Sequence, residues 1–274
     1  MADYKVVDIE QLEAGLTATA DAIRAKTGSS DEIPWNAETG MAANIEEVFD
    51  AAKQNAYDVF WDIYQYNGTR DDYRSAFAGA GWTDETFKPK YDIKPTKLAN
   101  SMFFCTRVTD LPKLLTEYGI EFDTSKATNL NTVFGGSSYL IKAPTLSTVS
   151  TTNINTLFDD CRNLESIEKL ILKDDGSQAP SNAFRYTYKL VDIVIEGVIG
   201  QNGFNFQWST LLSKASILSI INALSTTTTG LTVTFSLAAV NNAFETAEGV
   251  ADGSTSAEWT VLKATKSNWN IALV

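Results

Sequence analysis

The most informative absence in this sequence is histidine, which does not occur among the 274 residues. Histidine is the commonest general base and the commonest metal ligand, so its absence removes Ser-His and Cys-His nucleophile pairs. The two cysteines, Cys105 and Cys161, cannot form a zinc site alone, and their spacing does not match a C-x-x-C redox pair. These absences exclude more enzyme classes than any motif in the chain suggests.

Basic residues and long apolar runs are also scarce. There are 22 Lys and Arg against 34 Asp and Glu, a net charge of −12, so attraction to phosphate backbones or anionic lipid is not expected. No stretch approaches the ~18 consecutive apolar residues of a membrane span, and the first residues lack the pattern of a secretory signal. We expect a protein made in the cytoplasm, with no nucleic-acid or membrane partner.

Pairs of acidic residues are the remaining candidates for chemistry, and they are Glu46-Glu47, Asp159-Asp160 and Asp174-Asp175. Two carboxylates can hydrolyse glycosides at a suitable separation, but adjacent residues on a strand point to opposite faces. The stretches "DDGSQ" and "ADGST" lack calcium-loop spacing and predict turns, and no nucleotide-binding glycine motif occurs. We expect no catalytic, metal-binding or cofactor-binding residues, and a protein that is not an enzyme.

Two helices are predicted in the N-terminal quarter. The first follows Asp8 and ends at Gly28, and the second spans residues 42–67 and ends at Asn67-Gly68. The second carries apolar residues at alternating steps of four and three, which is a heptad seam of about three repeats. This seam either joins identical chains, with a trimer favoured, or packs on a neighbouring domain; its residues are Ile45, Phe49, Ala52, Ala56, Val59 and Ile63.

Four segments in the middle of the chain begin with a polar pair followed closely by a phenylalanine. These are Phe103, Phe134, Phe158 and Phe184, at intervals of 31, 24 and 26 residues. Small or apolar residues then recur at steps of three, which suits a solenoid coil that begins with tight turns. The inward sets are Ser137, Leu140 and Ala143; Cys161, Leu164 and Ile167; Thr187, Leu190 and Ile193; and, one residue shorter, Cys105, Val108 and Leu111.

This alignment gives both cysteines a packing role, because they fall where other segments carry Ser137 or Thr187. Alternation at Leu170 and Leu172, and at Ile193 and Ile195, predicts strands. The C-terminal part predicts a helix, a strand, a second helix after Ser256 and a closing strand, with these apolar positions in the first two: Ile217, Ile220, Ile221, Leu224, Val233 and Phe235.

Three stretches resemble known families. The stretch "NTLFDDCRNLESIEKLIL" resembles the BspA-like branch of leucine-rich repeats. "LTATADAIRAKTGSSDEI" resembles a short module of virion and tail-associated proteins of phages and prophages, and "AFAGAGWTDETFKPKYDIKPT" resembles the segment before the repeats in leucine-rich proteins of these phages. The resemblance implies an α+β fold with four parts: a helical attachment and oligomerisation region (1–68), an aromatic-rich cap (69–95), leucine-rich repeats (96–210) and a C-terminal repeat or cap (211–274).

The resemblance also implies a function. The expected protein is a bacteriophage structural protein, a tail fibre or appendage that adheres to a host surface glycan or protein, held by other virion proteins through its N-terminal region. The alternatives are a capsid-attached head fibre or decoration, and a bacterial leucine-rich interaction protein outside virions. A polysaccharide-degrading enzyme on the virion is a further alternative, and it would need a paired-carboxylate cleft that the sequence does not show. Arg185, Tyr186 and Tyr188 lie between inward positions, where they either contact a ligand or pack against the adjacent coil or a second subunit.

Overall fold

The computed structural model describes residues 54–79, 81–151, 153–245 and 252–274, and the chain divides into two compact units between Tyr66 and Asn67. In the first unit, residues 54–64 are helical. The predicted helix that ends at Gly28 lies outside the described residues. Asn67 and Gly68 have φ values of 51° and 80° in the 3-10 turn η1 (Tyr66–Gly68), so the predicted end of the second helix is confirmed.

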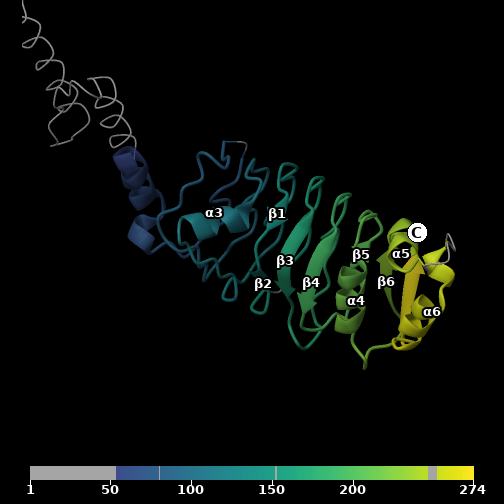
Figure 1. Ribbon diagram of the computed structural model, residues 1–274. Coiled ribbons are helices and arrows are strands. Elements are labelled where there is room, and N and C mark those ends of the chain that lie inside the picture. Colours follow the sequence, from purple (N-terminus) through teal and green to yellow (C-terminus); the bar gives the residue numbers. More distant parts are fainter. Residues whose placement is uncertain (1–53, 80, 152, 246–251) are drawn as a thin grey trace, which may run out of the picture. The chain divides into compact units, whose positions relative to one another are not determined.

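The second unit is a mixed α and β structure in which each described strand pairing is parallel. One sheet contains β1 (Lys142–Ala143), β2 (Leu146–Ser147), β3 (Ser166–Ile171) and β4 (Asp192–Glu196), with β3 between β4 and the two short strands. The other sheet has the order β5 (Asn205–Phe206), β6 (Leu231–Phe235), β7 (Trp269–Leu273). The strands of successive chain segments lie side by side (Figure 1).

The helices of this unit are α3 (Leu111–Glu117), α4 (Lys214–Ala223), α5 (Leu237–Ala243) and α6 (Ala257–Ala264), with a 3-10 turn η2 (Gly253–Thr255). The predicted C-terminal elements are confirmed as α4, β6, α6 and β7. Helix α3 was not predicted, although Asp110 accepts a hydrogen bond from Lys113 N at 3.1 Å and Pro112 lies in the first turn, which are ordinary signals of a helix start. Its presence accounts for the longest interval in the phenylalanine repeat.

A stack of phenylalanine rings forms the centre of the second unit. Neighbouring rings have centroids 4.5–6.0 Å apart, and most pairs are stacked. Sequence analysis found four members of this phenylalanine ladder, and the structure extends it at both ends. The members are Phe77, Phe103, Phe134, Phe158, Phe184, Phe206 and Phe235.

Backbone hydrogen bonds accompany the ring stack. We call the chain segment around each ladder phenylalanine a coil, and these bonds join each coil to the next. In the coil of Phe134, the N–H of this residue donates to the Leu157 carbonyl at 3.0 Å, and the residues two before and two after it donate to the same following coil. The same three bonds recur from the coils of Phe77, Phe103 and Phe158. We call the three donors of each coil its amide row. The flanking members have positive φ, and they are Ser75, Gly79, Ser101, Cys105, Thr132, Gly136, Thr156 and Asp160, with Asn182 and Tyr186 at the same places beside Phe184.

The period of three comes from consecutive tight turns after each ladder phenylalanine. Ser137 N donates to the Phe134 carbonyl at 3.0 Å, and Leu140 N donates to the Ser137 carbonyl at 3.0 Å. Because each bond spans three residues, every third side chain points the same way, into the core. Ser137 and Leu140 are both fully buried.

The predicted role of Cys105 as the inward residue of the first segment is wrong. Cys105 N donates to the Gly135 carbonyl at 3.0 Å, which makes it the last member of its amide row, and its side chain is only partly buried. The inward position belongs to Thr106, which is 1% exposed. The first segment is one residue shorter than the others, and the missing residue falls between Thr106 and Val108. The Thr106 hydroxyl accepts a hydrogen bond from Val108 N at 3.3 Å. The two cysteines are therefore not equivalent.

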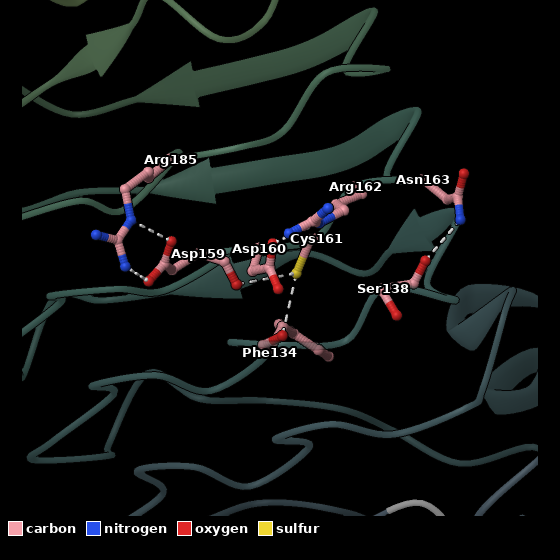
Figure 2. Close-up of polar contacts among 8 residues, drawn as sticks. All are labelled: Phe134, Ser138, Asp159, Asp160, Cys161, Arg162, Asn163 and Arg185. Carbon is pink, nitrogen blue, oxygen red and sulfur yellow. Dashed lines mark hydrogen bonds and ion pairs between the residues drawn. The ribbon is translucent and has the colours of Figure 1, made fainter.

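Cys161 does occupy the small inward position, and the structure shows what this position does. Its Sγ donates to the Phe134 carbonyl of the preceding coil at 3.0 Å, as Figure 2 shows, and Ser137 Oγ donates to the Phe103 carbonyl at 2.7 Å. Burial raises the pKa of the Cys161 thiol, which keeps it protonated and able to donate. A small side chain with a hydrogen-bond donor satisfies a carbonyl in the core at this place.

Helix α4 covers the edge of strand β4. Ser216 Oγ accepts a bond from Ile193 N at 2.9 Å, and Ser219 Oγ accepts one from Ile195 N at 2.8 Å. Serine side chains on the helix thus replace the next strand of the sheet. This arrangement protects an edge that could otherwise pair with another chain.

Adjacent phenylalanines allow a test of the ladder. Phe103 is fully buried in it, whereas Phe104 is 41% exposed. We expect Phe103→Ala to lower the free energy of unfolding by ~3–5 kcal/mol, the usual cost of removing a buried aromatic ring. Phe104→Ala should cost about 1 kcal/mol or less, since surface truncations are mild. Chemical denaturation of both variants measures this, and equal losses would contradict a central role for the stack.

Candidate functional site

Arg185, Tyr186 and Tyr188, the predicted ligand contacts, lie in the tight turns directly after Phe184. Arg185 forms a two-point ion pair with Asp159 of the preceding coil, with Nε 2.8 Å from Oδ1 and Nη2 2.5 Å from Oδ2 (Figure 2). This carboxylate raises the pKa of Arg185 and fixes the plane of its guanidinium group. The arginine is thus a preorganised cation.

A second ion pair lies beside the first. Arg162 Nε is 2.6 Å from Asp160 Oδ1, in the same pair of acids that precedes Cys161 (Figure 2). The guanidinium carbons of Arg185 and Arg162 lie 5.2 and 6.0 Å from the ring centroid of Tyr186. Both distances are within the range of cation–π attraction, so two fixed cations orient this tyrosine ring.

Three aromatic rings gather next to these ion pairs, and we call them the aromatic cluster: Tyr186, Tyr188 and Trp208. Tyr186 lies 6.0 Å from Tyr188 and 5.0 Å from Trp208 between ring centroids, and Tyr188 lies 6.2 Å from Trp208. Tyr188 is 39% exposed, and the other two are partly buried. Because Trp208 belongs to the coil of Phe206, Tyr186 and Tyr188 contact the adjacent coil.

Sequence analysis missed Trp208, although a signal existed. Trp208 follows Phe206 by two residues, as Tyr186 follows Phe184, and Ser209 and Leu212 then occupy the buried positions three and six residues after the phenylalanine. Extending the repeat by one member would have aligned the two aromatic residues.

A cavity of about 410 Å³ adjoins the aromatic cluster, between the coils of Phe184 and Phe206. Trp208 and Arg185 line it together with other residues of both coils, among them Asn182, Asn205 and Gln207. Its volume is in the usual range for small-molecule sites, ~300–1,000 Å³.

The acidic pairs among the described residues are used in ion pairs and turns. Asp159 and Asp160 each pair with a different arginine, and Glu46-Glu47 lies outside the described residues. The two turns predicted instead of calcium loops are confirmed, since Asp175 accepts a bond from Ser177 N at 2.9 Å and Asp252 accepts one from Ser254 N at 3.2 Å. Within the described ranges, no group of three or more Cys, Asp or Glu is arranged to hold a metal ion.

The predicted oligomer seam is described only in part. Ile45, Phe49 and Ala52 lie outside the described residues, while Ala56, Val59 and Ile63 lie on the helix of residues 54–64. All three are exposed, and the exposed fractions of Val59 and Ile63 are 51% and 71%. These exposed side chains form an apolar stripe on the helix surface.

Comparison with protein-family models, with curated proteins and with solved structures yields no match for this chain. In the part of the chain that the structure describes, no helix has the length and apolar character needed to cross a bilayer.

Proposed function

We propose that this protein is a bacteriophage virion structural protein, a tail fibre or appendage that presents a leucine-rich-repeat surface to the host. The observation that carries the proposal is the repeated coil itself. The phenylalanine ladder uses one position in each coil, the amide row uses the same three positions from the coil of Phe77 to that of Phe158, and the side chains between them are free to vary. Such a scaffold provides a binding surface without catalytic groups.

The form of the coils supports the BspA-like assignment. Small residues with a hydrogen-bond donor, then leucine, then isoleucine or alanine recur at steps of three, and parallel strands follow in two consecutive coils. The resemblance of the N-terminal stretches to phage modules supports the virion setting. The aromatic cluster with its fixed arginines, on the outside of the coils, suits recognition of a host surface glycan or protein.

The location of the chain in virus particles tests this proposal. We expect mass spectrometry of purified particles from the bacterium that carries the gene to detect the chain, and cryo-electron microscopy to reveal density on the tail that is lost when the gene is deleted. Density on the capsid instead would favour the head fibre. Absence from every particle would overturn the virion role and favour a bacterial interaction protein.

Oligomerisation through the seam is a second part of the proposal, because fibres are usually built from symmetric copies. We expect light scattering of the purified protein to give three times the chain mass of 30.0 kDa. Replacing Val59 and Ile63 with glutamate should give monomers, since it buries charge in the seam. Changing the exposed Gln54 and Asn55 to glutamate adds the same charge outside the seam and should leave the mass unchanged. A monomeric native protein, or a trimer that survives the seam variant, would contradict this part.

A further inference from the structure

The cavity beside the aromatic cluster lies at a break in the amide rows. The amides of Asn182, Phe184 and Tyr186 occupy the same positions as the donors of the four preceding coils. Among the described residues, none of these three amides donates to a backbone carbonyl of the following coil, nor to a side chain. The backbone ladder therefore stops after Phe184, although the ring stack continues to Phe206 at 4.5 Å.

The missing acceptors can be identified from the preceding coils. There, the three amides bind carbonyls of residues three before, one before and one after the next phenylalanine, as in the bonds to Ser181, Ala183 and Arg185. In the coil of Phe206 the matching residues are Gly203, Asn205 and Gln207, and all three line the cavity. The cavity thus lies beside the acceptor residues of the three missing hydrogen bonds and beside one of the donors, Asn182.

Two further features characterise the contact between these coils. Strand β5, which contains Asn205, pairs with β6 on its other side. Gly203 has a φ of 112° and lies so close to the preceding coil that a Cβ atom would be 1.9 Å from the Pro180 carbonyl oxygen. The two coils therefore come close at Gly203 and at the ring stack, and of the three residues with unpaired amides, Asn182 lines the cavity. Unpaired backbone groups require a polar partner, either water or a ligand.

We infer that this cavity binds a neutral saccharide. Sugar hydroxyl groups both donate and accept hydrogen bonds, which matches the unpaired backbone N–H of Asn182 and the side-chain amides of Asn182 and Gln207. Trp208 contributes an apolar ring face on which the C–H face of a pyranose can lie, and Tyr186 and Tyr188 brace this ring. Arg185 is held by Asp159 at the cavity margin, and the side of its guanidinium with Nη1 has no partner among the described residues.

Charge selects against acidic ligands. The net charge of −12 repels polyanions at long range, and the one basic residue that lines the cavity is already neutralised by Asp159. The inference rests on the proposed function only for the source of the saccharide, the host surface. The cavity and its hydrogen-bonding groups do not depend on a virion location.

The experiment uses the full chain and a set of neutral probes. Saturation-transfer NMR with glucose, galactose, mannose and N-acetylglucosamine, together with an array of neutral and acidic glycans, should identify at least one neutral saccharide that binds. Trp208→Ala should weaken its binding about tenfold or more, as for other aromatic anchors. Asn182→Ala, which removes an exposed side chain, should weaken binding about threefold, the effect of one lost hydrogen bond.

The control is Tyr139→Ala, which truncates a tyrosine that is 53% exposed and does not line the cavity. It should leave binding unchanged. Binding of acidic glycans alone, binding that is equally weak in all three variants, or no saccharide binding at all would overturn the inference. If Trp208→Ala does not fold, the saccharide affinity of Asn182→Ala is compared with that of Tyr139→Ala, and weaker binding by the first variant alone supports the inference. Saccharide binding by a chain that is absent from virus particles would overturn only the proposed function, and a chain found on the tail without saccharide binding would overturn only this site.

Discussion

From Phe77 to Phe206, the ring of each ladder phenylalanine packs against the ring of the next coil. In the first four coils, its backbone N–H also donates to a carbonyl of that coil. These two contacts determine much of the second unit. The amide row requires positive φ two residues before and after the phenylalanine, and it accepts this conformation even at Thr132 and Thr156, where a β-branched residue makes it costly. The tight turns that follow direct every third side chain into the core.

The surface between these fixed positions carries the candidate site. Asp159 and Arg185 follow successive ladder phenylalanines by one residue, and Tyr186 and Trp208 follow theirs by two. Their proximity is thus a direct result of the stacking of coils. Where backbone pairing continues, as from Phe158 to Phe184, ion pairs cover the outside of the coils. Where it stops, between Phe184 and Phe206, a cavity lies between the coils.

Sequence analysis predicted the parts of this structure that depend on local spacing. The positions of Phe103, Phe134, Phe158 and Phe184 gave four of the stacked rings, and the apolar periodicity gave α4 and β6. The same reasoning assigned Cys105 wrongly, because an alignment without coordinates cannot locate a one-residue shortening on either side of a small residue. It missed α3 because the capping signals of Asp110 and Pro112 were not considered apart from the repeat.

The cavity could not be predicted from the sequence at all. It lies where backbone pairing is absent between two coils, next to the close approach of Gly203 to Pro180. Trp208 lies in the one interval of 22 residues, and this irregular interval concealed the repeat. A longer repeat comparison would have found the residue but not the opening beside it.

Amide hydrogen exchange, resolved by residue, tests most directly whether the backbone ladder stops where the structure indicates. The account predicts slow exchange for the amides of Phe103, Phe134 and Phe158, which are hydrogen-bonded to the next coil, and much faster exchange for those of Asn182, Phe184 and Tyr186. Equal protection of the two groups would mean that the coils pair continuously through Phe206, and it would contradict the origin of the cavity described above.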